Sequence, residues 1–145
     1  MKTRLIYITR YLLLTTILLT SVACSKEQTD VATIVDNLWE YSLENPDGFT
    51  VEIPDMVTVT NGFAVAYYID FNNVGKESLT DIVNHALENN NIVGGWLDTD
   101  DNVYYFDSIK IFDDSQQEQA EQFAIENQQK AYYDLTNQVT IFPEE

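Results

Sequence analysis

Apolar residues in this chain recur with two different periods, one typical of helices and one typical of strands. From residue 31 to residue 44 they return every three or four positions, which predicts an amphipathic helix that ends near Asn45. Similar stripes follow Ser78 and Ser115 and predict two further helices, the third reaching about Gln129. The first stripe consists of Val31, Ile34, Val35, Leu38 and Trp39.

Shorter runs between the helices are typical of strands, in which successive side chains point to opposite faces of a sheet. The run 63–70 is the clearest, with odd-numbered residues pointing to one face of a sheet and even-numbered residues to the other. Asn61-Gly62 predicts a tight hairpin turn before it, because both residues tolerate positive φ. The expected strands are 49–53, 56–60, 63–70, 92–97, 103–108 (with 109–112 continuing it or forming its own), 131–135 and 138–142.

The order of these elements predicts the fold class. Helix, strands, helix, strands, helix, strands favours an α+β fold, a largely antiparallel β-sheet with about three helices packed on one face. No long linker interrupts residues 31–145, so we expect a single acidic domain there, with residues 24–30 as a short tether ahead of it.

The first 23 residues have the pattern of an export signal. A basic start without acidic residues leads into an apolar stretch of about a dozen residues, too short to span a bilayer. Val22 and Ala23 end this stretch directly before Cys24, the only cysteine. The arrangement resembles the signal of bacterial lipoproteins, which are cut before an acylated cysteine. The basic residues are Lys2, Arg4 and Arg10.

This resemblance implies a lipid on Cys24 and a place in the cell envelope, at the outer membrane and facing the periplasm or the surface. Ser25-Lys26-Glu27 also resembles a surface-export signal of one Gram-negative phylum. Ser21 stands where the lipoprotein family prefers leucine, so an ordinary cleaved signal with an incidental cysteine is the alternative.

Charge narrows the range of partners. Without residues 1–23 the chain keeps four lysines, no arginine and all 24 acidic residues, a formal charge of −20. Nucleic acid and anionic lipid headgroups would repel such a domain, so we expect no nucleic-acid partner and a membrane contact made through the lipid alone. The same field favours a basic protein partner, a cationic ligand or a divalent metal. Acylation of Cys24 would leave no thiol for disulfides or catalysis.

One polar turn carries part of a calcium-binding pattern. Asp98, Asp100 and Asn102 place oxygen ligands at alternate positions, as the first half of such a loop does. Val103 stands where that loop needs glycine, and Ile109 stands where it needs a bidentate glutamate. We therefore expect no cofactor, with Ca²⁺ at these three residues as the alternative to a solvated hairpin tip.

Few residues indicate catalysis. His85 is the only histidine and lies beside the apolar stripe of its helix, without a G-x-S-x-G motif or a free cysteine to serve. Acidic pairs such as Asp113-Asp114 fall where turns are expected, and a carboxylate pair of the glycosidase kind stays open. No catalytic residue is assigned.

Aromatic residues on the expected sheet are the candidate binding groups. If the odd-numbered residues of 63–70 face the helices, Tyr68 lies on the opposite face, and the same alternation adds Tyr104, Phe112 and Tyr132. Exposed aromatics among acidic residues suit the binding of a protein or a sugar. Gly94-Gly95 lies inside a strand, where we expect the glycines to make room for a helix while Trp96 fills the core.

The stretch from about Asn61 to Ile141 is similar to a group of small uncharacterised α+β proteins of gut bacteria and their mobile elements. The resemblance implies a folded domain and no particular activity. The residues that carry it are Ile92-Val-Gly-Gly-Trp96, Tyr104-Tyr-Phe-Asp-Ser108, Ile111-Phe112, Asn127-Gln-Gln129 and Asp134-Leu135.

These features favour a lipid-anchored, non-catalytic module that binds a protein, as an inhibitor or immunity protein does. A carbohydrate- or nutrient-binding accessory lipoprotein is the second hypothesis, and a small hydrolase is the third.

Overall fold

The structure, a computed structural model, describes residues 29–70, 72–100 and 102–144. These residues form three α-helices, one short 3₁₀ helix and a seven-stranded antiparallel sheet, which confirms the expected α+β class. The export segment 1–23 and Cys24 lie outside the described residues. In the part of the chain that the structure describes, no helix has the length and apolar character needed to cross a membrane.

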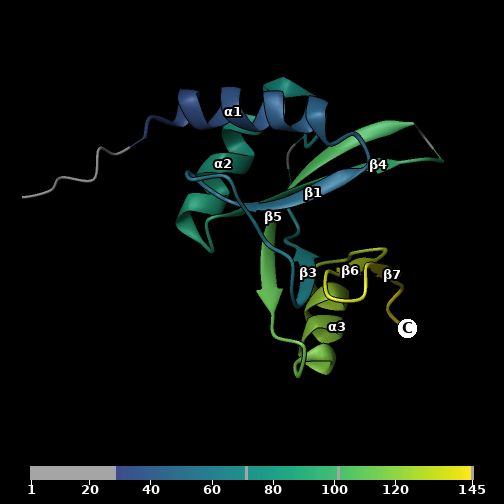
Figure 1. Ribbon diagram of the computed structural model, residues 1–145. Coiled ribbons are helices and arrows are strands. Elements are labelled where there is room, and N and C mark those ends of the chain that lie inside the picture. The colour runs from purple at the N-terminus through teal and green to yellow at the C-terminus, as the bar shows by residue number, and fades with distance from the viewer. Residues whose placement is uncertain (1–28, 71, 101, 145) are drawn as a thin grey trace, which may run out of the picture.

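The strands lie in the order β2-β1-β4-β5-β3-β6-β7. The long strand β5 belongs to both halves of this sheet, because its first half pairs with β4 and its second half with β3. Figure 1 shows β5 running from the layer under α1 and α2 down to α3. The elements are α1 (Val31–Glu44), β1 (Gly48–Glu52), β2 (Val57–Thr58), β3 (Phe63–Ala66), η1 (Lys76–Ser78), α2 (Leu79–Glu88), β4 (Ile92–Asp98), β5 (Val103–Phe112), α3 (Gln117–Glu126), β6 (Tyr132–Asp134) and β7 (Val139–Ile141).

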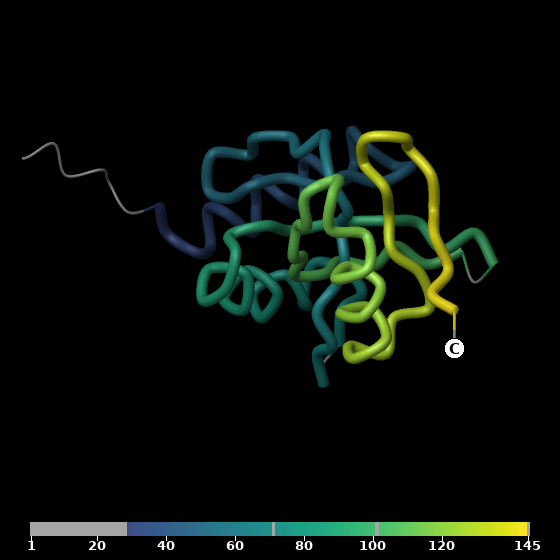
Figure 2. Tube along the Cα trace, turned by 90° about the horizontal axis from the view of Figure 1, so that it is seen from below, coloured from purple at the N-terminus to yellow at the C-terminus, as the bar shows by residue number. Residues whose placement is uncertain are grey.

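All three helices cover the same face of the sheet. On β5, Phe106 packs with α1 and α2, whereas Phe112 packs with α3. Residues an even number apart on a strand point to the same face, so both helical layers share it. Seen from below, α3 lies in front of the sheet with the β6–β7 hairpin beside it (Figure 2).

The core follows this division. The larger cluster under α1 and α2 includes Ile34, Leu38, Val51, Ile53, Leu79, Ile82, Val83, Ala86, Val93 and Phe106. The cluster under α3 contains Phe63, Val65, Phe112, Ala120, Ala124 and Tyr132. A small third cluster of Ala64, Ala66 and Ile109 lies on the opposite face. The expected alternation of residues 63–66 is therefore confirmed, with both faces of β3 buried.

The capping patterns were poorer guides than the apolar stripes. Helix α1 has the bounds that its stripe predicts. Ser78 makes no side-chain cap for α2, because its hydroxyl donates to the carbonyl oxygen of Gly75 within the preceding 3₁₀ turn. Helix α3 begins at Gln117 after the N-cap residue Gln116, so Ser115 does not cap it either.

Asn61-Gly62 forms no hairpin, which corrects the prediction. Strand β2 pairs with β1, while β3 pairs with β5 and β6. Gly62 has a φ of 85°, and its N–H donates to Asp114 Oδ1 and to Thr136 Oγ1. Its carbonyl oxygen accepts the N–H of Leu135. The glycine thus joins two distant loops where the chain crosses between the halves of the sheet.

Candidate functional site

The face of the sheet opposite the helices carries a partly exposed aromatic pair. Trp96 on β4 stands directly across from Tyr105 on β5, and their ring centroids lie 5.4 Å apart with an interplanar angle of 25°. A stacked pair of this kind contributes about 0.5–1.5 kcal/mol beyond the area it buries. Trp96 is 46% exposed, so the pair presents aromatic surface to solvent. We call Trp96 and Tyr105 the aromatic platform.

A buried carboxylate fixes the indole of the platform. Oδ2 of Asp107 accepts a hydrogen bond of 3.2 Å from Trp96 Nε1, and Oδ1 accepts one of 2.9 Å from Asn73 Nδ2. Burial raises the pKa of Asp107, while these two hydrogen bonds act to lower it. Because both carboxylate oxygens already have partners, Asp107 serves to hold Trp96 in one orientation.

The segment that carries Asn73 is itself tied to β5. The carbonyl oxygen of Asn73 accepts the N–H of Phe106 at 2.8 Å, and Val74 forms an isolated antiparallel bridge with Tyr105. These contacts lie on the side of β5 away from β4, in the half of the strand that does not pair with β3. Backbone hydrogen bonds therefore place the Asn73 amide beside Asp107.

The neighbouring strand β1 places no side chain directly across from the indole. In β1 the residue paired with Trp96 is Gly48, which has no side chain to lay over the ring. Its φ is 127°, and a β-carbon there would lie 2.9 Å from the carbonyl oxygen of Gly95. Conformation and space both favour glycine at this position.

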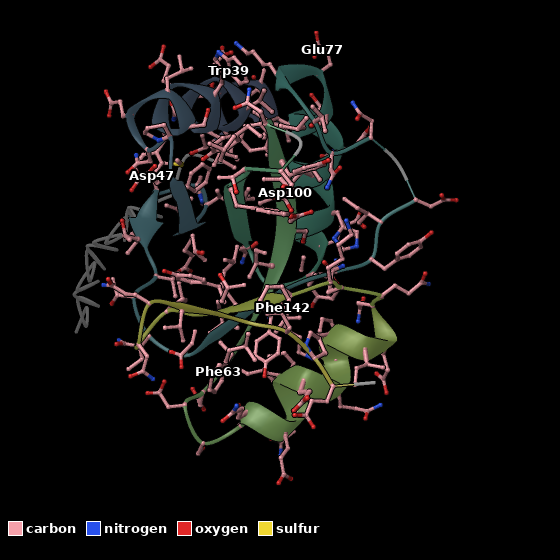
Figure 3. All side chains as sticks on the ribbon, turned by 90° about the vertical axis from the view of Figure 1, so that its right-hand side faces the viewer. Trp39, Asp47, Phe63, Glu77, Asp100 and Phe142 are labelled. Atoms are coloured by element: carbon pink, nitrogen blue, oxygen red, sulfur yellow. The ribbon has the colours of Figure 1, made fainter. Side chains whose placement is uncertain are left out.

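The face of the sheet that carries the platform also carries acidic residues. By strand alternation, Glu52 on β1 and Asp98 on β4 share its face of the sheet. Among the described lysines, Lys76 pairs with Asp36 at 2.7 Å, and Lys110 lies on the helical face of β5. Figure 3 views the molecule from the side on which the β4–β5 turn and β7 lie. Asp100 is labelled above Phe142 in this view.

The predicted aromatic face is wrong in most of its members. Tyr104 packs with the cluster under α1 and α2, and its hydroxyl donates to the carbonyl oxygen of Asn45. Phe112 and Tyr132 are buried under α3. Only Tyr68 is well exposed, at 52%, and it lies beyond the end of β3. The error is one of register, because the even-numbered residues of β5 face the helices and Tyr105 faces outward.

The polar turn between β4 and β5 is organised by its own hydrogen bond. Oδ1 of Asp98 accepts the N–H of Asp100 at 2.9 Å, and Asn102 adopts a left-handed φ of 54°. Within residues 29–70, 72–100 and 102–144, no three or more His, Cys, Asp or Glu side chains gather in an arrangement that could hold a metal ion. An Asx-turn accounts for Asp98 and Asp100 without a ligand.

His85 lies at the boundary of the buried face, between aromatic and amide neighbours. Its ring meets that of Tyr67 edge to face at 5.2 Å, and its Nδ1 lies 3.5 Å from Asn89 Nδ2. The hydroxyl of Tyr67 donates to Asn90 Oδ1 at 2.6 Å. These contacts connect α2 to β3 and its following segment.

Gly94 and Gly95 make room for side chains of the sheet. The prediction that they make room for a helix is wrong. A β-carbon on Gly95 would lie 2.5 Å from Phe49 Cε1 and 2.9 Å from Tyr104 Cε1. A β-carbon on Gly94 would lie 2.9 Å from Ile109 Cγ1. Trp96, expected in the core, stands outside it.

Sequence reasoning missed the platform and its anchor, although one signal was present. In 103–108, Tyr105 alternates with Phe106 and shares its face with Asp107. An acidic residue two positions from Tyr105 indicates an outward face for both. No model of a known protein family, no curated protein and no solved structure matches the chain significantly. Function therefore has to be argued from the geometry of the platform.

Proposed function

We propose that the chain is a non-catalytic module that binds a basic protein through the aromatic platform, while a lipid on Cys24 holds it in the cell envelope. The stacked pair of Trp96 and Tyr105, fixed by buried Asp107, is the observation that carries this proposal. A ring already held in one orientation loses little conformational entropy on binding, and tryptophan is prominent among residues that dominate interface energies.

Charge selects the partner. A lysine or arginine of the partner would lie on the free face of Trp96, close to the carboxylate of Asp98. A cation over a tryptophan ring contributes about 0.5–2 kcal/mol, depending on how far it is desolvated. The formal charge of −20 after residue 23 would also attract a basic protein over a longer range and raise its association rate.

The proposed anchor places this binding at a membrane. The lipoprotein-like pattern of residues 1–24 supports it, and the acidic domain has no electrostatic reason of its own to stay near anionic lipid. The partner would then be a basic protein that reaches the same envelope compartment, which suits an inhibitor or immunity protein.

Peptide titration tests the platform directly. The probes are three short peptides that differ only in carrying arginine, lysine or norleucine at the same positions. Calorimetry should show binding of the arginine and lysine peptides and little binding of the norleucine peptide. Trp96→Ala should weaken that binding about tenfold or more. Tyr68→Ala is the matched control, since Tyr68 is similarly exposed and lies off the platform.

The fluorescence of Trp96 can report peptide binding at the platform itself. The described chain contains Trp39 and Trp96, and Trp39→Phe leaves Trp96 as its single tryptophan. Peptide binding should then change the emission, and raising ionic strength from about 0.05 M to about 0.5 M should weaken the affinity. Unchanged affinity in Trp96→Ala, or affinity that ignores salt, contradicts the proposal.

Two alternatives have distinct outcomes in the same assays. Binding of neutral glycans that is lost in Trp96→Ala would favour a carbohydrate-binding accessory lipoprotein. The proposal needs no metal, but calcium at Asp98, Asp100 and Asn102 stays the alternative for the turn, and titration with CaCl₂ would detect it. Peptide affinity that depends on calcium would show that the turn and the aromatic platform act together in binding.

A further inference from the structure

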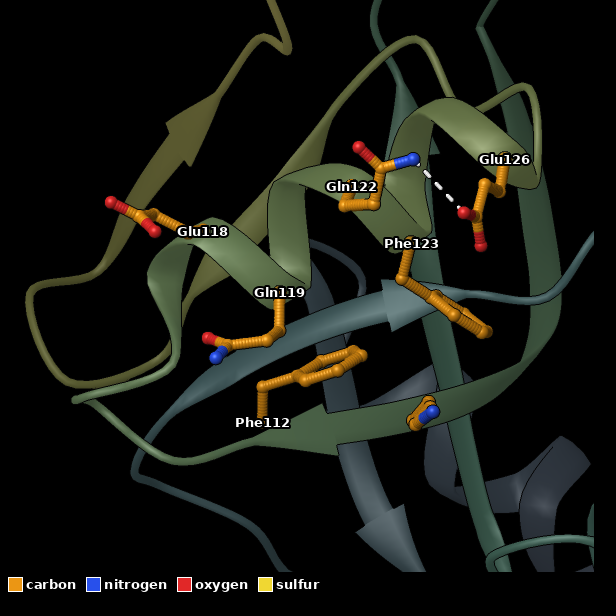
Figure 4. Close-up of a pocket in the computed structure, with 7 residues that line it drawn as sticks. Phe112, Glu118, Gln119, Gln122, Phe123 and Glu126 are labelled. Atoms are coloured by element: carbon orange, nitrogen blue, oxygen red, sulfur yellow. Dashed lines mark hydrogen bonds between the residues drawn. The ribbon is translucent and has the colours of Figure 1, made fainter.

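A hollow with a volume of about 420 Å³ lies between α3 and the second half of β5. It is on the helical face of the sheet, whereas the aromatic platform is on the opposite face. The side chains of Phe112 and Phe123 form its floor, with ring centroids 5.5 Å apart. Figure 4 shows these two rings between the helix and the strand.

Lys110 brings a positive charge onto this aromatic floor. Its Nζ lies 4.8 Å from the ring centroid of Phe112 and 4.5 Å from that of Phe123. Within the described part of the chain, no carboxylate comes within ion-pair distance of this ammonium. Lys110 is thus held by aromatic faces, and its N–H donors stay available to a molecule in the hollow.

The helical wall of the hollow supplies amides and carboxylates. Gln119 and Gln122 project from α3 at the edge of the hollow, with Glu118 and Glu126 further along the same helix (Figure 4). Gln122 Nε2 donates to Glu126 Oε1 at 2.9 Å. The rim therefore combines hydrogen-bond donors with acceptors of negative charge.

We propose that this α3–β5 hollow binds a neutral sugar ring. A hydroxyl group both donates and accepts hydrogen bonds, so one polyhydroxylated ring can accept from Lys110 and donate to Glu118 or Glu126. The volume falls within the range of small-molecule sites, toward its lower end.

Charge rules against the other ligand classes. An anion drawn to Lys110 would meet two rim carboxylates and the field of a strongly acidic domain. A cation drawn to the carboxylates would meet Lys110 in the centre of the floor. A ligand without net charge avoids both penalties and can still bind Lys110 together with one of the rim carboxylates.

Amide chemical shifts measured by NMR test this site. The probes are the methyl glycosides of glucose, galactose, mannose and N-acetylglucosamine, with glucuronate as the charged counterpart. At least one glycoside should bind with a Kd on the order of 1 mM or tighter. The shifts should be confined to α3 and the second half of β5, and glucuronate should bind more weakly.

Variants separate this site from the platform. Lys110→Met keeps the apolar stem and removes the charged donor, and should weaken the glycoside about tenfold or more. Gln119→Ala changes an exposed residue of α3, so it gives a second test that does not risk the fold. Lys130→Met, at an exposed lysine elsewhere, should leave the affinity unchanged, and so should Trp96→Ala.

Three results would overturn the inference. The first is that none of the four glycosides shifts these amides. The second is that glucuronate binds more tightly than the glucoside, which would indicate an anion site. The third is full affinity in both Lys110→Met and Gln119→Ala. None of these results bears on peptide binding at Trp96.

Discussion

Trp96 and Asp107 connect an exposed aromatic ring of the sheet to one of its buried carboxylates. The indole Nε1 donates to Oδ2 of Asp107 at 3.2 Å, although Trp96 is 46% exposed and Asp107 only 8%. An exposed ring is usually free to change rotamer, whereas this one is restrained by a partner that has little freedom itself. The predictions below concern this anchor, the packing around it and the proposed membrane attachment.

Asp107 should make stability depend on pH. Burial raises the pKa of Asp107 above 3.8, so the native chain takes up this proton at a higher pH than the unfolded chain does. The native state then binds more protons in that window, and the contribution of this group to the free energy of unfolding rises as pH falls through it. Relative to wild type, the free energy of unfolding of Asp107→Asn should therefore be highest near neutral pH and should fall toward pH 4, whatever the constant cost of the hydrogen-bond acceptor that asparagine lacks. Urea unfolding across this range measures it, and a difference between the two proteins that is constant with pH would contradict it.

The phenol of Tyr104 should lose its proton at a higher pH than an ordinary tyrosine does. Burial, with a smaller effect of Asp47, raises the pKa of Tyr104 to about 12 from 10.0. Between these values the unfolded chain loses the proton first, so the group's stabilising contribution is lost as pH rises through the window. The ultraviolet difference titration between wild type and Tyr104→Phe should have its midpoint near 12. A midpoint at 10 would show that the phenol is solvated.

Replacing Ser108 with alanine should stabilise the protein. Its side chain is fully buried on the helical face of β5, and its Oγ has no hydrogen-bond partner among the described residues. Ser108→Ala should raise the free energy of unfolding by about 1 kcal/mol, since it removes an unpaired buried hydroxyl. Ser42→Ala is the matched control, because the buried Ser42 hydroxyl donates to the carbonyl oxygen of Trp39 and its loss should destabilise. Chemical denaturation should show a higher free energy of unfolding for Ser108→Ala and a lower one for Ser42→Ala than for wild type.

Gly95 should not accept a methyl group. A β-carbon would lie within 3 Å of ring atoms of Phe49 and Tyr104. Gly95→Ala should therefore cost about 1–3 kcal/mol, as overpacking does. The double variant Gly95→Ala with Phe49→Leu should recover part of that loss relative to the sum of the single changes. Strict additivity in a double-mutant cycle would mean that the ring is not the obstacle.

Cys24 should decide the proposed membrane attachment. Cys24→Ser removes the acylation site of the lipoprotein-like signal, and the acidic domain should then be recovered in the soluble fraction. Fractionation with and without detergent measures this, and Ser25→Ala is the neighbouring control. Retention of Cys24→Ser in the membrane fraction would argue for a different anchor.

Local periodicity predicted the helices and most of the strands well, because both depend on neighbours in the sequence. Helix α1 and the strands β6 and β7 lie where the pattern places them. Asn61-Gly62 misled because turn chemistry is local, while β3 finds its partners in β5 and β6, far along the chain. The pairing of distant strands leaves little signal in either segment.

The candidate site was harder to predict for a different reason. Asp107 is acidic yet buried, and Trp96 is aromatic yet exposed, so neither has the exposure that its side-chain polarity indicates. Their hydrogen bond explains each departure, and it joins positions whose relation depends on the β4–β5 register. That register pairs Asp98 with Val103, and a sequence pattern locates such a pairing only to within a residue or more.

Because β5 supplies a wall to both main hydrophobic clusters, neither cluster can persist after that strand departs. Disruption that begins at either end of β5 therefore removes support from both halves. The described domain should thus lose its structure in one cooperative transition, and the central amides of β5 should exchange with solvent only when the whole molecule opens. A protease acting on an exposed turn would find no stable half-domain to leave behind.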